Sequence, residues 1–206
     1  MNQGSHWQQV YTEKAADEVS WYQAVPARSL EWIEAAAPDR SAAIIDVGAG
    51  ASALADGLLE RGYTRLAVLD LASSALAAVR ARLAGRAELV EWYACDVLDF
   101  VSPHRFDLWH DRAVLHFLVD PEERRRYAEV VRDTVRPGGH VLIATFAPGG
   151  PTRCSGLGVV QLGIGEIGEL LGGEFVCRRE EQELHRTPGG VDQLFQYALY
   201  ERRPAQ

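Results

Sequence analysis

The chain has 206 residues, and its 21 Lys plus Arg against 29 Asp plus Glu give a formal net charge of −8. This length fits a single domain with a sizeable core, and the lack of a long apolar span argues against membrane insertion or secretion. The negative charge repels a nucleic-acid backbone, so DNA and RNA are disfavoured as partners. The three cysteines are widely separated, which favours a reducing cytoplasm and predicts neither a disulfide framework nor a metal site.

The first forty residues are rich in aromatic side chains and end in a predicted helix from about residue 26 to residue 37. We expect residues 1–40 to form a lid over the carboxyl ends of the strands. Residues 41–206 are then the core of the same single domain, which we expect to be a monomer or a homodimer. The aromatic residues of this lid are Trp7, Tyr11, Trp21, Tyr22 and Trp32.

From about residue 41, apolar runs alternate with amphipathic segments. The runs predict strands over residues 42–47, 65–70, 87–96, 106–114 and 140–146. The segments predict helices over residues 73–83 and 121–135, with Asp120 as a cap for the second helix and Pro137-Gly-Gly139 as its sharp end. Strand and helix in alternation predict an α/β fold with a Rossmann-like, doubly wound sheet.

The tail departs from this alternation, because two strand-like runs follow each other with no helix between them. They cover residues 174–183 and 193–202, and the turn-forming sequence His185-Arg-Thr-Pro-Gly-Gly190 joins them. This pattern predicts an antiparallel hairpin at one edge of the sheet.

Residues 44–50 read Ile-Ile-Asp46-Val-Gly48-Ala-Gly50, and Asp70 closes the next apolar run. A Gly-rich turn after a buried strand lets a ligand approach bare backbone, and an acidic residue that ends the next strand binds the hydroxyls of a ribose. The expected ligand is an adenosine-type cofactor. A tight strand-to-helix turn without a ligand is the alternative interpretation.

The residues around this turn distinguish between adenosine cofactors. Dinucleotide enzymes need a third glycine where Ser52 stands, and Asp46 beside the turn repels a pyrophosphate. The same carboxylate attracts the ammonium and sulfonium groups of S-adenosylmethionine (SAM). We therefore favour SAM, with S-adenosylhomocysteine (SAH) as product, over a nicotinamide or flavin dinucleotide.

Polar residues at other predicted strand ends are further candidates. Asp96 follows the third strand, and like Asp46 it has the alternative role of a helix cap. His110, Asp111 and Arg112 end an apolar strand, where polar groups without partners are costly to bury. They are expected either to contact cofactor or acceptor, or to fix the loop through an ion pair between Asp111 and Arg112.

Other candidates each have a structural alternative. His116 is a candidate base, although its apolar surroundings favour a hydrogen-bonded core residue. The rings of Trp21 and Tyr22 are expected either to close over a sulfonium or to pack within the lid. Cys154 and His185 suit a metalloid or a thiol, but a packed cysteine beside turn residues is the simpler interpretation.

The residues described so far resemble the class I SAM-dependent methyltransferases along essentially the whole chain. Asp46-Val-Gly48-Ala-Gly50 resembles the first motif of the family, and Leu69-Asp70-Leu71 its ribose-binding strand end. Cys95-Asp96-Val97 is similar to the turn that holds the adenine amine. Residues 106–118 resemble the fourth-strand motif beside the methionine part of the cofactor, and Arg136-Pro-Gly-Gly139 resembles the entry to strand five. The resemblance implies a seven-stranded, mostly parallel sheet with a reversed last strand.

A closer resemblance is to a bacterial subgroup with four further motifs. They correspond here to Ser20-Trp-Tyr-Gln23, His110-Asp-Arg-Ala-Val114, Cys154-Ser-Gly-Leu157 and His185-Arg-Thr-Pro-Gly-Gly190. The resemblance implies cofactor contacts for His110 and Asp111. The chain departs from the subgroup at two places, with Gly149 where an acidic residue is expected and Gln161-Leu162 where an Arg-Tyr pair is expected.

These observations predict a cytoplasmic SAM-dependent methyltransferase with a small-molecule acceptor. The candidate catalytic residues are Asp111 and His116, and the candidate acceptor-binding residues are Arg112, Cys154, His185 and Gln193. A protein lysine methyltransferase is the enzyme alternative, because the Trp-Tyr opening resembles eukaryotic lysine methyltransferases and an acidic surface attracts a basic segment. A non-catalytic SAM-binding regulatory module is the second alternative, and a dinucleotide oxidoreductase is the least favoured.

Overall fold

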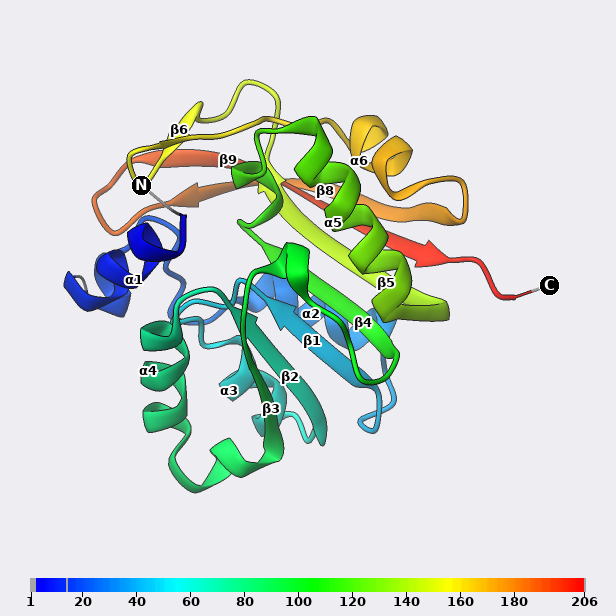
Figure 1. Cartoon of the computed structure of the whole chain (residues 1–206), viewed down its shortest axis with the longest axis horizontal. Coiled ribbons are helices and arrows are strands. Elements are labelled where there is room, and N and C mark those ends of the chain that lie inside the picture. Colours follow the sequence, from blue (N-terminus) through cyan, green and yellow to red (C-terminus); the bar gives the residue numbers. More distant parts are fainter. Residues whose placement is uncertain (1–2, 14, 206) are drawn as a thin grey trace.

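The computed structural model describes residues 3–13 and 15–205, and it forms a seven-stranded sheet between two layers of helices (Figure 1). The strands of the sheet are β1 (Ala43–Val47), β2 (Arg65–Asp70), β3 (Val90–Ala94), β4 (Phe106–Arg112), β5 (Val135–Phe146), β8 (Phe175–Arg186) and β9 (Asp192–Arg202). The α-helices are α1 (Gln3–Glu13), α2 (Ala27–Ala36), α3 (Leu54–Glu60), α4 (Ser73–Leu83), α5 (Pro121–Thr134) and α6 (Ile164–Leu171).

Short elements join these parts. The 3-10 helices are η1 (Ala16–Glu18), η2 (Ala84–Leu89), η3 (Val97–Asp99) and η4 (Leu115–Phe117). A separate two-stranded ribbon, which the sequence did not predict, consists of β6 (Arg153–Cys154) and β7 (Leu157–Gly158). The predicted third strand is shorter than expected, because residues 84–89 form η2 before β3 begins.

The strand order is β3-β2-β1-β4-β5-β9-β8. Strands β1 to β5 run parallel, and β9 is antiparallel to both β5 and β8. The prediction of a mostly parallel, seven-stranded sheet with a reversed last strand is therefore confirmed, as is the terminal hairpin. Because the carboxyl ends of β1 to β5 meet at one edge, the side chains that follow these strands converge there.

The two faces of the sheet carry different helices. One apolar cluster packs α2, α3 and α4 against residues such as Ile44, Leu66 and Leu108, and the other packs α5 and α6 against residues such as Trp109 and Ile143. In Figure 1, α5 and α6 lie in front of the sheet and α2 lies behind it. Within the residues that the structure describes, no helix is both long and apolar enough to cross a membrane.

Helix α5 begins where the sequence predicted. The Asp120 carboxylate accepts a hydrogen bond from the Glu122 N–H at 2.9 Å, and Pro121 occupies the first turn. The helix ends at Thr134, but β5 begins at once at Val135, earlier than predicted. The reason is that Val135 is fully buried and pairs with Phe106, and the register of β4 and β5 is irregular immediately after this pair.

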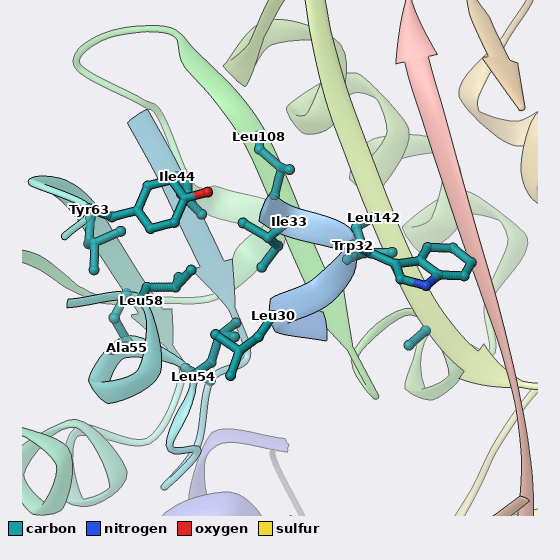
Figure 2. Close-up of a cluster of buried hydrophobic side chains, with 14 of the residues drawn as sticks. Leu30, Trp32, Ile33, Ile44, Leu54, Ala55, Leu58, Tyr63, Leu108 and Leu142 are labelled. Carbon is teal, nitrogen blue, oxygen red and sulfur yellow. The ribbon is translucent and has the colours of Figure 1, made fainter. Parts of the chain in front are cut away.

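Helix α2 corrects the expectation for the lid. Trp32 and Ile33 are fully buried, and Figure 2 shows both side chains among those of the sheet and α3. The Trp32 ring meets the ring of Tyr197 on β9 edge-on, at 5.9 Å between centroids. The apolar face of α2 therefore belongs to the core, because burial of such side chains is more favourable there than over an open edge. Of the described residues 3–13 and 15–26, Trp7, Tyr11, Trp21 and Tyr22 lie near the carboxyl ends of the strands.

Candidate functional site

A cavity lies at the carboxyl edge of the parallel strands, beneath α1. Its empty volume, with the open mouth included, is about 670 Å³. Trp7 and Tyr11 line it from one face of α1, and Trp21 and Phe117 complete an aromatic wall. The ring of Trp7 meets those of Trp21 and Phe117 edge-on, at centroid distances of 5.6 and 4.9 Å.

Asp70 lines this cavity at the end of β2. Its carboxylate accepts hydrogen bonds from the backbone N–H groups of Gly50 and Ala72, each at 2.7 Å. Burial raises the pKa of Asp70 to about 6, and the two N–H donors and the neighbouring carboxylate of Asp46 act on it more weakly. The backbone thus holds this carboxylate in a fixed orientation, at the position where the sequence predicted a ribose-binding residue.

The glycine turn between β1 and α3 brings bare backbone to the cavity. Gly48 and Gly50 have φ values of +60° and +54°, in the region that favours glycine. A Cβ at Gly48 would collide with the side chain of Val114, and one at Gly50 would collide with the hydroxyl of Tyr11. Gly48 lines the cavity, whereas Gly50 lies behind Asp70 and donates to it.

Asp96 lies at the other side of the same cavity, after β3. Its carboxylate accepts a hydrogen bond from the Leu98 N–H at 2.9 Å and so caps the short helix η3. Leu71 and Val97 line the cavity beside Asp70 and Asp96 respectively. The role of helix cap that was considered for Asp96 and its position in the cavity therefore occur together.

Asp46 and His110 line a second, smaller cavity that shares Gly48, Trp21 and Arg112 with the first. His110 Nδ1 lies 2.7 Å from a carboxylate oxygen of Asp46, and its Nε2 lies 2.9 Å from the Ser29 hydroxyl on α2. Tyr22 lines the same cavity. The imidazole is held from both sides, so it fixes the orientation of Asp46 beside the glycine turn.

Asp111 is fully buried and lines neither cavity. Its carboxylate accepts hydrogen bonds from the Tyr127 hydroxyl at 2.6 Å and from the N–H groups of Val114 and Leu115. Burial raises its pKa to about 6 against the effect of these donors. The candidate catalytic carboxylate is thus enclosed by its own loop, and the side chain of Arg112 binds other partners.

His116 is also fully buried and lines neither cavity. Its ring stacks on Phe146 with 4.3 Å between centroids, and neither ring nitrogen has a hydrogen-bond partner in the described residues. Burial lowers the pKa of His116 to about 3, with a smaller contribution from the Arg112 guanidinium. The candidate base is therefore a neutral core side chain, separated from the cavity.

Two of the candidate acceptor-binding residues contact Ser20, which precedes Trp21, and a third lies opposite one of them. His185 Nε2 is 2.8 Å from the Ser20 carbonyl oxygen, and the Cys154 thiol is 3.8 Å from its hydroxyl. Gln193 is buried on β9, opposite His185. None of the three lines either cavity; His185 and Cys154 instead attach the segment before α2 to the terminal hairpin and to the β6–β7 ribbon.

Gln161, which stands where the subgroup has an arginine, forms hydrogen bonds with the loop after β5. The Gln161 side-chain amide accepts a hydrogen bond from the Gly149 N–H and donates to the carbonyl oxygens of Gly150 and Pro151, while Leu162 is buried in the core. Gln161 therefore holds this loop in place from outside the two cavities.

Sequence reasoning did not assign several residues that line the site. Trp7 and Tyr11 were identified only as lid aromatics, although their spacing of four residues indicates one face of a helix. Val114 and Phe117 gave no separate signal within an apolar run. Ser29 contacts His110 only because α2 packs against the end of β4.

The charged side chains that line the two cavities follow the ends of neighbouring parallel strands. Asp46, Asp70 and Asp96 supply carboxylates from the ends of three neighbouring strands, and Arg112 supplies a cation from the end of β4. Within the described residues, no group of three or more His, Cys, Asp or Glu side chains is placed to hold a metal ion. This arrangement suits a ligand with hydroxyl groups and positive charge, such as a nucleoside that carries an ammonium or a sulfonium.

The chain is similar to known methyltransferases. Residues 44–139 match the model of a methyltransferase domain. A ubiquinone biosynthesis O-methyltransferase from Ralstonia nicotianae is 32% identical over 122 residues, which cover 57% of this chain and 48% of that protein. The chain thus spans about half the length of this curated relative.

Two solved methyltransferases have the same fold. The 1,6-didemethyltoxoflavin-N1-methyltransferase of Burkholderia thailandensis has a TM-score of 0.71 and 21% identity, over 98% of this chain and 87% of that chain. The N-methyltransferase NodS of Bradyrhizobium japonicum has a TM-score of 0.72 and 20% identity, over 96% and 98%. Together with the matched domain, they confirm the class I methyltransferase fold predicted from the sequence.

Proposed function

We propose that this chain, whose residues 44–139 form a methyltransferase domain of the class I type, transfers a methyl group from SAM to a small molecule. The observation that carries the proposal is the set of three carboxylates, Asp46, Asp70 and Asp96, at the ends of adjacent strands beneath an aromatic wall. The solved relatives support the cofactor, since NodS and the toxoflavin enzyme were crystallised with SAH.

The residues of the site fit SAM. In the proposal, Asp70 binds the ribose hydroxyls, and Asp96, Val97 and Leu71 form the adenine subsite. Gly48 lets the ligand approach the backbone, and Asp46, oriented by His110, attracts the ammonium group. The bound cofactor supplies a methyl group on a sulfonium, which is transferred by in-line displacement without a metal.

In this reaction the protein positions the reacting molecules and excludes water from them. Trp21 and Tyr22 close one side of the shared space, and the rings of Trp7 and Phe117 close another. Such enclosure raises the rate by holding the reacting atoms together in a dry site. Because Asp111 and His116 lie outside both cavities, the proposal gives them structural roles in the loop after β4 and assigns no base to the chain.

The acceptor is proposed to be a small molecule because α1 and the residues around Trp21 cover the cavity. The relatives act on toxoflavin precursors and in ubiquinone biosynthesis, which supports the same class. A cytoplasmic location, a single domain and a monomer or homodimer complete the proposal. A protein lysine acceptor and a non-catalytic SAM-binding module stay as alternatives for the experiment below.

The test begins with calorimetry of the purified protein with SAM, SAH and NAD. We expect SAM and SAH to bind and NAD to fail. Methyl-labelled SAM is then incubated with the protein and with a cell extract separated by ultrafiltration into small molecules and proteins. Label in the small-molecule fraction supports the proposal, and label only in the protein fraction indicates the lysine alternative. Binding without transfer to either fraction indicates a regulatory module, and binding of NAD alone contradicts the assignment of SAM.

A further inference from the structure

Arg112 is the one Lys or Arg side chain of the described residues that lines the two cavities. Its Nε donates a hydrogen bond to the Tyr197 hydroxyl at 3.0 Å, and its Nη1 donates to the Trp21 carbonyl oxygen at 2.7 Å. Its Nη2 is buried and has no hydrogen-bond partner in the described part of the chain. Two of the three nitrogens thus hold the guanidinium in place, and the third keeps its donors free.

The charge of Arg112 is also unpaired. No carboxylate forms an ion pair with it in residues 3–13 and 15–205, whereas more exposed arginines such as Arg40 and Arg126 do have an acidic partner. A part-buried guanidinium with only neutral partners loses hydration without receiving a compensating charge. A bound anion would supply that charge and accept the free hydrogen bonds.

The side chain of Arg112 lies on the β9 side of the site, whereas Asp70 and Asp96 follow strands on the other side of β1. Its guanidinium carbon is 4.8 Å from the centre of the Phe195 ring on β9, while Asp70 and Asp96 follow β2 and β3. Phe195 also contacts the rings of His116 and His185. The cation therefore lines both cavities from the β9 side, away from Asp70 and Asp96.

We propose that the methyl acceptor is a small anion with a carboxylate or a comparable oxyanion, and that Arg112 Nη2 binds it. The inference rests on the proposed function, because it names the acceptor class of the same site. Guanidinium N–H groups bind planar oxyanions through charge-assisted hydrogen bonds. The rings of Trp7, Trp21 and Phe117 favour a flat, partly apolar body for this acceptor.

The experiment uses matched pairs of probes on the full chain saturated with SAH. Benzoate, salicylate and anthranilate are titrated by calorimetry beside their neutral amides, benzamide, salicylamide and anthranilamide. We expect at least one carboxylate to bind about tenfold or more tightly than its amide, and Arg112→Gln to remove this preference. Arg112→Lys keeps the charge and should retain part of it, and the exposed Arg125→Gln is the control.

The outcomes separate the two proposals. Saturation of the wild-type protein with SAH is measured first, and its failure contradicts the proposed function rather than the acceptor class. Unchanged SAH affinity of Arg112→Gln shows that the variant is folded and that Arg112 does not serve the cofactor. The acceptor proposal is overturned if no carboxylate is preferred over its amide, if the preference survives in Arg112→Gln, or if the variant loses SAH affinity while 5′-methylthioadenosine still binds normally. The last result would assign Arg112 to the carboxylate of the cofactor.

Discussion

The two halves of the site differ in how their polar groups are satisfied. At the ends of β1 to β3, the carboxylates of Asp46, Asp70 and Asp96 each have a hydrogen-bond partner, from a backbone N–H group or an imidazole. At the end of β4, Arg112 Nη2 is buried and has no hydrogen-bond partner among the residues that the structure describes.

The half at the ends of β1 to β3 therefore has its polar groups oriented without a ligand, whereas the half at the end of β4 has a buried donor that needs a ligand to form its hydrogen bonds. Backbone donors and the His110 imidazole orient the first set of groups before any ligand arrives, so little reorganisation accompanies binding. The second half keeps a buried polar atom, Arg112 Nη2, whose hydrogen bonds a ligand can complete. Recognition of a common cofactor and recognition of a particular acceptor thus use different physical arrangements.

The largest expected effect is that of Asp70→Asn. The variant removes the charge that the Gly50 and Ala72 N–H groups orient. SAH affinity should fall about thirtyfold or more, since removal of one partner of a buried charged contact costs about 2 kcal/mol or more. Calorimetry measures the change, and the exposed Glu88→Gln is the matched control. Equal SAH affinity in both variants would show that Asp70 does not contact the cofactor.

The pH dependence of SAH binding follows from the pKa of Asp70, which burial raises to about 6. The ionised carboxylate is needed for ribose binding, so SAH affinity should fall about tenfold per pH unit below about pH 6. The free energy of unfolding changes in the opposite direction. The folded carboxyl holds its proton more tightly than the unfolded one, so its contribution to stability is present at low pH and is lost as the pH rises from about 4 to about 6. A flat binding profile for the wild-type protein would contradict this assignment.

Tyr127→Phe tests the buried support below the loop after β4. The change removes the donor to Asp111 and the acceptor of the Trp109 indole N–H. The free energy of unfolding should fall by about 2 kcal/mol because two buried groups lose a partner, while SAH affinity stays unchanged. Chemical denaturation measures the loss. Tyr93→Phe, which removes a more exposed contact with Glu91, is the control and should cost less.

Gly50→Ala and Gly62→Ala compare two positions with positive φ. Both substitutions place an L residue in that region, which lowers the free energy of unfolding by about 1 kcal/mol or more. Only the Cβ at Gly50 meets the Tyr11 hydroxyl, whereas the space around Gly62 is empty. SAH affinity should therefore fall several-fold in Gly50→Ala alone. Equal affinities in the two variants would show that contact of α1 with this turn is irrelevant to cofactor binding.

The smallest expected effect is that of Cys154→Ala. The thiol has one weak contact, with the Ser20 hydroxyl, and burial raises its pKa. The free energy of unfolding should change by less than about 1 kcal/mol, with no change in SAH affinity. Cys177→Ala is the exposed control. Complete loss of methyl transfer with intact SAH binding would instead place the thiol at the acceptor.

The sequence was most informative where local backbone dictates function. The glycine turn, Asp70 at the end of β2 and Asp120 at the start of α5 are specified by neighbours in the chain, and the structure has the expected elements around each. The mostly parallel sheet and its antiparallel edge hairpin also followed from the alternation of elements and from the sequence of the tail.

Residues that depend on distant packing were not predictable in this way. The apolar run around His116 gave no indication that Phe146 would stack on its ring, and nothing near Asp111 indicated that Tyr127 would enclose it. Trp32 shared its aromatic character with the lid residues, but its position on the apolar face of α2 put it in the core. Tertiary contacts between elements far apart in the sequence decided each of these cases.

The reversed direction of β9 has an evolutionary consequence. Because β9 runs against β5, the connection of residues 187–191 lies at the same edge as the carboxyl ends of the parallel strands. It joins β8 and β9, the last two strands at one edge of the sheet, which lie three positions or more from β1 and β2. Insertions or changes of charge in this connection therefore leave the glycine turn and its carboxylates unchanged. Related proteins can thus differ in this connection while they keep the same cofactor-binding residues.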